Sequence, residues 1–402
     1  MFLEIIIAIV LGCLFGIFTG LIPGIHINLI SLLVLSLSAY LLEITSPLSI
    51  SVFIISMAIT HTFLDSIPSI FLGAPEGGDN ALSVLPGHKM LLDGRGYEAV
   101  MLTLIGSFFA LILAIIISYP IGMLIESIYP YLQKIMGYIL IFASVFLIIR
   151  ERKSRIWALI IFLLSGVLGL STLSLINLKN PLFPLLSGLF GTSTLIVSLS
   201  DKTKIPKQKI TFPKINKTKL NKTMGASLIA GSLCSFLPGL GPAQAAIIGS
   251  EFYKKITNEY FLVLVGGLNT INMILSFIAL YLLDKARNGA VVIISKIMES
   301  VGAMELIIFF ASALVAGGIA VFLTIKITKI FSRILEKVNY RKLVVSIIFL
   351  IFIMVFVLSS NFIGLLILTT STFLGIIPVK LGIGRNHLMG CLLFPVILYF
   401  LL

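Results

Sequence analysis

Charged side chains are scarce in this sequence. Lys, Arg, Asp and Glu make up 11% of its 402 residues, and hydrophobic residues make up 58%, whereas about 25% of the residues in a soluble domain are charged. Apolar runs of roughly 17 to 25 residues recur along the chain, and each is long enough to cross a hydrocarbon layer about 30 Å thick. The composition excludes a water-soluble globular domain and predicts a chain embedded in the membrane from end to end.

Cysteine is also rare, and the sequence motifs of common enzymes are missing. Cys13, Cys234 and Cys391 each stand alone in an apolar stretch, which excludes a disulfide framework and a CxxC metal site and favours small packing residues. The chain has no HExxH, GxGD, GxSxG or Walker P-loop motif, so protease, hydrolase and ATPase chemistry lacks its residues. We therefore predict no enzymatic activity, no cofactor and no metal centre.

The basic residues lie in short loops between the apolar runs and give a net charge of +13. They form no single basic face of the kind that binds nucleic acid. The positive-inside rule places three clusters in the cytoplasm and predicts a multi-pass protein of the cell membrane in contact with membrane lipids. The clusters are Arg150, Arg152, Lys153 and Arg155; the lysines of residues 200–222; and Arg333, Lys337, Arg341 and Lys342.

Two apolar stretches are interrupted by Pro-Gly pairs, at Pro23-Gly24 and at Pro238-Gly239. Because Pro removes a backbone donor and Gly permits left-handed backbone, each pair favours the tip of a helical hairpin. Counting spans from the basic clusters makes the two hairpins enter the membrane from opposite faces. The lysine-rich segment 200–222 divides the chain into a first membrane repeat (1–199), a basic cytoplasmic linker that we expect to be flexible (200–222) and a second membrane repeat (223–402).

The strongest pattern is self-similarity at an offset of 215 residues. Gly12, Gly16 and Gly20 precede Pro23-Gly24, and Ser227, Gly231 and Ser235 precede Pro238-Gly239 at the same spacings. Small residues spaced by four share one helix face and let another backbone approach closely. A weaker correspondence at an offset of 208 aligns His61 with Asn269.

These patterns predict an all-α polytopic membrane protein with about 12 to 14 membrane segments in two inverted-topology repeats, each with a Pro-Gly-tipped hairpin. Paired interrupted helices mark the substrate site of many secondary transporters, because the helix that starts at each tip points its positive dipole end at an anion. The candidate substrate-binding residues are Pro23, Gly24, His26, Asn28, Pro238, Gly239, Gly241, Gln244, Asn269 and Asn272.

Ionisable residues inside apolar runs are costly and are functional candidates. His61 and Asp65 are spaced i, i+4 and share a helix face, so they form either a proton-coupling pair or a structural hydrogen-bonded pair. Glu76, Asp79 and Asn80 lie in a Gly-rich break and complete the candidate ion-coupling set for H⁺ or Na⁺. Arg385, Asn386 and His387 near the last span are interpreted as headgroup anchors.

The sequence resembles the TctA family, the large membrane subunit of tripartite tricarboxylate transporters. The resemblance runs through nearly the whole chain. It is carried by the two small-residue runs that end in Pro-Gly, by Pro242 after the second pair, by the Asp93-Gly94-xx-Gly96 turn and by Pro184-xxx-Gly188-Leu-Phe-Gly191. It implies a carboxylate permease driven by an ion gradient, working with a small membrane subunit and an extracytoplasmic binding protein.

Three functions remain open at this stage. The first is a secondary transporter for small carboxylate anions of the tricarboxylate type, coupled to H⁺ or Na⁺. The second is a translocase for an anionic lipid carrier such as a polyprenyl phosphate, because a hairpin tip suits a phosphate headgroup as well as a carboxylate. The third, an alternative to the prediction of no enzymatic activity, is an intramembrane lipid-processing enzyme that uses His61 and Asp65.

Overall fold

The computed structural model describes most of the chain, with short gaps. The described residues are 2–22, 27–73, 84–151, 153–176, 178, 181–200, 206–237, 241–253, 256–286, 288–335, 340–359 and 362–401.

Every regular element in these ranges is a helix. In chain order they are α1 (Phe2–Leu21), α2 (Ile27–Ser36), α3 (Ser38–Leu41), α4 (Pro47–Leu64), α5 (Ser66–Phe71), α7 (Val84–Leu92), α8 (Gly96–Arg150), α9 (Arg155–Leu173), α10 (Leu182–Leu186), the π-helix η1 (Ser187–Thr192), α11 (Ser193–Ser200), α12 (Lys217–Phe236), α13 (Pro242–Glu251), α14 (Asn258–Leu283), α15 (Gly289–Ile297), α16 (Ala303–Leu335), α17 (Tyr340–Ser359), α18 (Phe362–Leu381), the 3₁₀ helix η2 (Arg385–Met389) and α19 (Gly390–Leu401).

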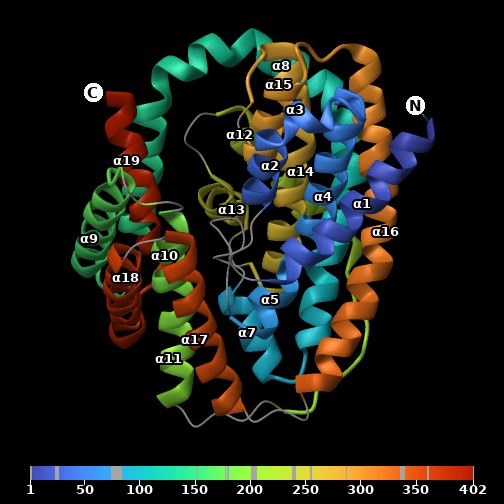
Figure 1. The fold of residues 1–402 in the computed structure, drawn as a ribbon. Helices are drawn as coiled ribbons and strands as arrows, with labels where there is room; N and C mark the ends of the chain where they lie inside the picture. Colours follow the sequence, from blue (N-terminus) through green and yellow to red (C-terminus); the bar gives the residue numbers. More distant parts are fainter. Residues whose placement is uncertain are drawn as a thin grey trace.

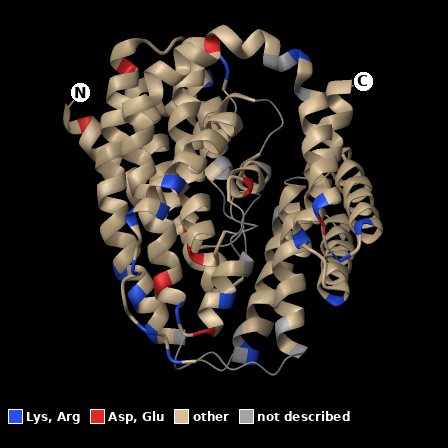
Figure 2. Ribbon diagram, turned by 180° about the vertical axis from the view of Figure 1, so that it is seen from behind, with Lys and Arg blue, Asp and Glu red and all other residues tan. Residues whose placement is uncertain are grey.

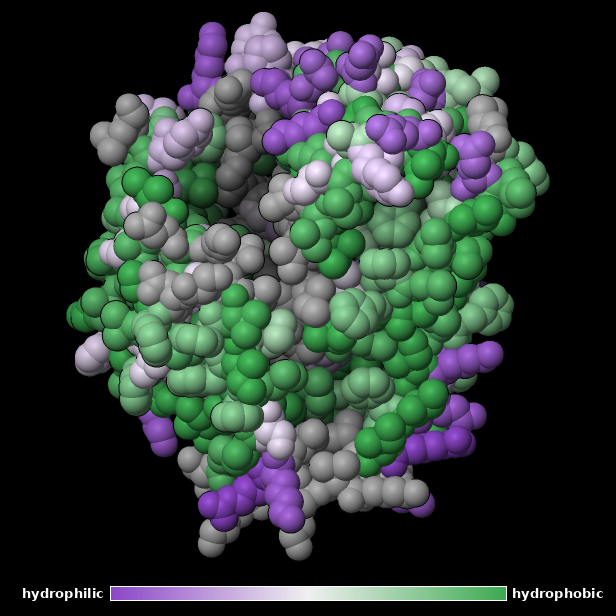
Figure 3. Space-filling model, viewed as in Figure 1, coloured by the Kyte–Doolittle hydropathy of each residue, from purple (hydrophilic) through white to green (hydrophobic). Residues whose placement is uncertain are grey.

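The outer surface has the character of a membrane protein. Seven helical segments of the described chain are long and apolar enough to cross a membrane, and four shorter apolar segments accompany them. Hydrophobic side chains cover the middle of the molecule while hydrophilic ones gather mainly at its two ends (Figure 3), and charged residues are sparse along the helices (Figure 2). The prediction of an all-α, multi-pass membrane protein is confirmed. The inverted relation between its halves stays a prediction.

The helices form two groups that lie side by side (Figure 1). The first bundle consists of α1, α2, α4, α5, α7, the first part of α8, α14, α15 and α16, whose buried side chains form one apolar core. The second bundle consists of the last part of α8, α9, α10, η1, α13, α18, η2 and α19, which share a second core. Helices α12 and α14 contribute to both of these cores, and a third, smaller core joins α10, α11, α17 and α18. The two chain ends lie on opposite sides of the molecule (Figure 1).

One helix connects the two bundles. The sequence predicts separate spans over 97–118 and 134–149, but α8 is continuous for 55 residues and contains Pro120 and Pro130. Figure 1 shows it leaving the first bundle, passing over one end of the molecule and running back beside α19. A proline removes one backbone hydrogen bond and bends a helix without having to end it, so the two predicted apolar spans are present as two limbs, Gly96–Tyr131 and Gly137–Arg150, of one helix rather than as separate helices.

The two sequence halves interleave in space. Helix α14, from the second half, packs along the first part of α8 and against α4, both from the first half. Helices α9 and η1, from the first half, pack on α19 and α18, from the second. The division into repeats at residues 200–222 therefore remains a prediction about the sequence, because the bundles do not coincide with the halves.

The described part of the basic linker is anchored, which differs from the flexible segment expected. Gln208 is buried, accepts a hydrogen bond from the Gly96 N–H at 2.9 Å and donates one to the Leu91 carbonyl at 3.0 Å. The Lys209 N–H donates to the Gly94 carbonyl at 2.8 Å. This places residues 206–209 against the turn between α7 and α8, and from Lys217 onward the segment is already helical.

Candidate functional site

The small-residue stripe of α1 packs against α4 at backbone distance. A Cβ on Gly12 would lie 2.5 Å from the Phe53 carbonyl oxygen, and one on Gly16 would lie 2.7 Å from that of Met57. Both are closer than real Cβ contacts come, so glycine is required for this approach. The stripe predicted from the sequence is therefore a helix contact face, and it leads toward the first Pro-Gly pair.

The stripe of α12 packs against α14 in a corresponding way. Ser227 Oγ donates to the Leu264 carbonyl at 3.2 Å, and Ser235 Oγ lies 3.4 Å from the Asn272 carbonyl. A Cβ on Gly231 would lie 3.3 Å from the Leu268 carbonyl. On α4, the corresponding carbonyls that Gly12, Gly16 and Gly20 approach are those of Phe53, Met57 and His61. Each lies 211 residues before its counterpart on α14. The contacts thus align His61 with Asn272 rather than with Asn269.

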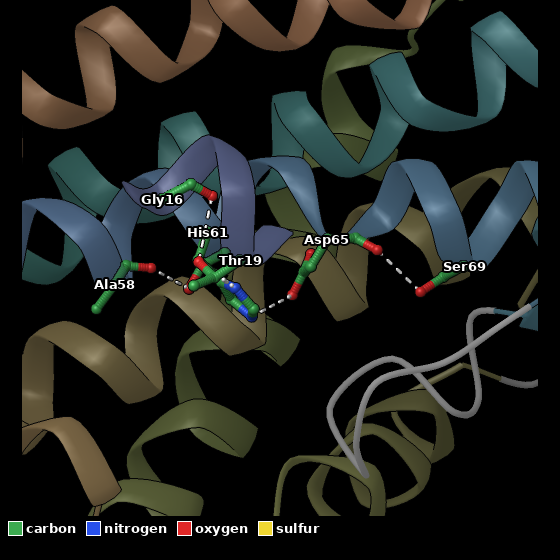
Figure 4. Close-up of polar contacts among 7 residues, drawn as sticks. Gly16, Thr19, Ala58, His61, Asp65 and Ser69 are labelled. Carbon is green, nitrogen blue, oxygen red and sulfur yellow. Dashed lines mark hydrogen bonds and ion pairs between the residues drawn. The ribbon is translucent and has the colours of Figure 1, made fainter. Parts of the chain in front are cut away.

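His61 is the central polar side chain of the α1–α4 contact (Figure 4). It is 3% exposed, its Nδ1 lies 3.1 Å from Thr19 Oγ1, and its Nε2 lies 4.0 Å from Asp65 Oδ2. Asp65 is 5% exposed. The predicted i, i+4 pair is therefore brought together within the buried core of the first bundle, and Thr19 is a third member that the sequence reasoning did not identify.

Thr19 links His61 to the backbone of α1. The Thr19 hydroxyl donates to the Gly16 carbonyl at 3.3 Å, and in that arrangement its oxygen can accept from the Nδ1–H tautomer of His61. His61 Nε2 faces the Asp65 carboxylate. The arrangement can hold one exchangeable proton between an imidazole and a carboxylate that are both removed from water.

Asp65 also lies where the helix is interrupted. Pro68 has no N–H to offer the carbonyl of Leu64, and α4 ends at that residue. At the next residue, the Asp65 carbonyl accepts a hydrogen bond from the Ser69 hydroxyl at 2.9 Å, as Figure 4 shows. Thr103 of α8 donates to Ser66 at 3.0 Å on the other side of the junction, so the break is supported by a polar contact from a neighbouring helix.

The second-half residues that correspond to this pair are uncharged. Asn272 Oδ1 accepts from Ser235 Oγ at 3.3 Å, and the Ser276 hydroxyl donates to the Asn272 carbonyl at 2.6 Å. Asn269, one turn earlier on α14, is buried at 7% exposure. The predicted pair Asn269 and Asn272 thus lies on a buried helix, with Asn272 joined to the stripe of α12.

Several predicted site residues lie outside the described part of the chain. They are Pro23, Gly24, His26, Pro238 and Gly239 among the substrate-binding candidates, and Glu76, Asp79 and Asn80 among the ion-coupling candidates. Asn28 is the second residue of α2, Gln244 is the third of α13, and Gly241 is the N-cap of α13. Asn28 and Gln244 therefore stand in the first turn of the helix that follows each Pro-Gly pair.

The interpretation of Arg385 and His387 as headgroup anchors is wrong. Arg385 is 6% exposed and His387 is 2% exposed, so neither side chain can reach a lipid headgroup. His387 Nε2 lies 3.1 Å from Glu151 Oε2, which also accepts from the Gly384 N–H at 3.1 Å. Burial raises the pKa of Glu151, but hydrogen bonds from the Lys153 and Gly384 amides and from His387 outweigh it and hold that pKa below its ordinary value.

Comparison with known proteins identifies the chain at family level. The model of the tripartite tricarboxylate transporter TctA family matches residues 6–390. The chain is 30% identical over 404 residues to "Uncharacterized protein MJ1079" of Methanocaldococcus jannaschii, with 98% of each chain covered. No solved structure matches.

Proposed function

The chain belongs to the tripartite tricarboxylate transporter TctA family, and we propose that it is a secondary-active permease for small carboxylate anions, driven by a cation gradient. The observation that carries the coupling is the buried pair of His61 and Asp65, whose Nε2 and Oδ2 atoms lie 4.0 Å apart. Buried ionisable side chains within a membrane span are typical of proton pathways in transporters. We therefore favour H⁺ over Na⁺ as the coupling ion.

In this proposal the substrate carboxylates bind between the two hairpins, where the N-terminal turns of α2 and α13 direct backbone N–H groups and their dipoles at an anion. The predicted substrate-binding residues Asn28 and Gln244 stand in those turns, and Asn269 and Asn272 on α14 supply uncharged hydrogen-bonding groups. Protonation of the His61 and Asp65 pair, which touches the stripe of α1 through Thr19, changes how the first hairpin is held. That contact couples proton binding to the substrate site.

Family membership also supports two partners. Transporters of this type are tripartite, so we propose that this chain works with a small membrane subunit and an extracytoplasmic binding protein. The absent enzyme motifs and the transporter family together favour transport over catalysis. A polyprenyl-phosphate translocase is the alternative that the experiment below would support instead.

The test is uptake into proteoliposomes. Labelled citrate and succinate are offered with an inward H⁺ gradient, with an inward Na⁺ gradient and with neither, and a pH-sensitive dye reports the interior. We expect uptake with the H⁺ gradient and interior acidification that depends on substrate. His61→Gln and Asp65→Asn should abolish acidification, while Asp93→Asn, which removes an exposed carboxylate between α7 and α8, should leave it unchanged.

Each other outcome is informative. Uptake that follows only the Na⁺ gradient would refute the assignment of the proton to His61 and Asp65 and move coupling elsewhere. Absence of carboxylate uptake, together with thermal stabilisation of the protein by polyprenyl phosphate alone, would refute the permease and support the lipid translocase.

A further inference from the structure

Arg385 is a buried cation within the second bundle. It starts η2 and is 6% exposed. Its guanidinium donates to Thr194 Oγ1, to Ser193 Oγ and, at 2.7 Å, to the Leu189 carbonyl. It also lies over the ring of Phe190 at 5.9 Å from the centroid. All of these contacts come from η1 and α11, so the cation sits against one short polar segment of the chain.

The positive charge has no negative partner in the described part of the chain. The three acceptors are neutral, and no Asp or Glu among the described residues forms a salt bridge with Arg385. The carboxylate of Glu151 instead accepts from the Gly384 amide and contacts His387. An arginine stays protonated in a protein, and buried charges are ordinarily paired because removing them from water is costly.

One donor of the guanidinium is also unused. Arg385 Nε is buried and has no hydrogen-bond acceptor, although a buried donor without a partner costs about 1–3 kcal/mol. A buried arginine that holds an uncompensated charge and a spare Nε–H is suited to bind an anion through that N–H, because hydrogen bonds between a charged donor and a charged acceptor are the stronger ones.

Further polar side chains lie at the contact between α18 and η1, the π-helix whose Leu189 carbonyl accepts from Arg385. Ser187 Oγ and Ser371 Oγ are buried and have no partner, and Thr192 bonds to Thr372 at 2.5 Å. A π-helix such as η1 frequently marks a functional site. The hydroxyls provide further donors for an anion in a region that is otherwise apolar.

The position of η2 relates this region to the second hairpin. Helix η2 contacts α13, the helix that follows Pro238-Gly239, and also α9 and α18. The end of α13 is tied to the same neighbourhood, because Glu251 forms an ion pair with Arg150, which directly precedes Glu151. An anion held by Arg385 would therefore lie beside a helix of the proposed substrate pathway.

We propose that Arg385 is an anion-binding residue whose ligand is a small anion with carboxylate-like oxygens or a halide. If the chain is the proposed permease, this anion is a carboxylate group of the substrate. This assignment of the ligand rests on the proposed function. The alternative source of the same chemistry is a free inorganic anion that neutralises the site. In either case the guanidinium charge, rather than the hairpin backbones alone, compensates the negative charge of the ligand.

The test measures anion binding and transport separately. The full-length protein in detergent is titrated with sodium citrate, succinate, chloride and phosphate at equal ionic strength, and thermal unfolding gives an apparent Kd for each. For the anion that binds, Arg385→Gln should raise the apparent Kd by about tenfold or more, because the variant loses a charged hydrogen-bond partner. Lys380→Gln, which removes an exposed cation of α18, should leave every Kd unchanged.

Arg385→Lys keeps the charge but loses the planar fork, so it decides the question if Arg385→Gln does not fold. We expect it to bind the anion severalfold more weakly than the native protein. An unchanged Kd in either folded variant, or the absence of stabilisation of the native protein by any of the four anions, overturns the site.

The transport measurement separates the two proposals. If chloride or phosphate binding depends on Arg385 and no carboxylate is bound or transported, the site stands and the carboxylate permease fails. If native protein and Arg385→Gln take up citrate equally well and also bind all four anions with equal Kd, the site fails and the permease stands.

Discussion

Replacing Gly16 by alanine tests whether the α1 stripe is a contact face at backbone distance. The new Cβ would lie 2.6 Å from Thr60 Cβ and 2.7 Å from the Met57 carbonyl oxygen. Neither atom is the end of a flexible side chain, so α1 and α4 must separate. Overpacking of this kind costs about 1–3 kcal/mol, and the better helix propensity of alanine offsets at most about 1 kcal/mol.

Gly231→Ala and Gly318→Ala are the matched comparisons. The nearest atoms to a Cβ on Gly231 are Ile271 Cγ2 at 2.6 Å and Ile271 Cβ at 2.8 Å, whereas the nearest backbone atom, the Leu268 carbonyl oxygen, is 3.3 Å away. A Cβ on Gly318 of α16 meets nothing within 4 Å. We therefore expect the largest loss of stability for Gly16→Ala, a smaller loss for Gly231→Ala, and no loss or a slight gain for Gly318→Ala.

The assay uses the three cysteines, all of which are buried and free. A thiol-reactive dye that becomes fluorescent on reaction follows their exposure as the detergent-solubilised protein is heated. Gly16→Ala should lower the midpoint by a few degrees relative to Gly318→Ala, as expected for roughly 1–2 kcal/mol. Equal midpoints for these two variants would refute the close packing of α1 on α4.

Three further predictions concern the polar contacts. Thr19→Val removes the acceptor of His61 Nδ1 and should shift the pH dependence of transport while leaving the fold intact; an unshifted profile in proteoliposomes would contradict the proton assignment. Gln208→Ala removes the hydrogen bonds that anchor the linker and should speed trypsin cleavage at Lys207 severalfold, measured by gel against the native protein; unchanged cleavage would show that these bonds do not hold the segment. The folded-state pKa of Glu151 is lowered, so its stabilising contribution is present above the unfolded pKa and is lost as pH falls through the folded value. Melting from pH 7 to pH 4 should therefore show a smaller acid loss for Glu151→Gln than for the native protein, and equal losses would contradict this.

The sequence predicted the features that depend on local periodicity. The spacing of Gly12, Gly16 and Gly20 is enough to define a helix contact face, and the i, i+4 spacing of His61 and Asp65 is enough to bring them together on one helix. Both follow from helix geometry. The sequence could not identify the helix that receives the stripe, so the contact of His61 with Thr19 was missed although Thr19 lies within that run.

Features that depend on tertiary burial were not predictable. Arg385 stands between Gly384 and Asn386, a context in which an exposed anchor is the ordinary expectation, and only the packing of η2 on η1 and α9 buries it. Gln208 lies among exposed lysines and carries no local signal of burial. The apolar runs 97–118 and 134–149 predicted two spans, and their hydrophobicity gives no sign that one helix continues between them.

The continuity of α8 has a mechanical consequence for alternating access. Because its first part packs in one bundle and its last part in the other, the bundles cannot slide freely past one another while the helix stays intact. Relative motion must instead be absorbed where α8 crosses from one to the other, in the segment bounded by Pro120 and Pro130, where each proline has already removed a backbone hydrogen bond. In the proposed permease, that segment would be the fulcrum of a rocking movement, and its bending stiffness would set part of the barrier between outward-open and inward-open states.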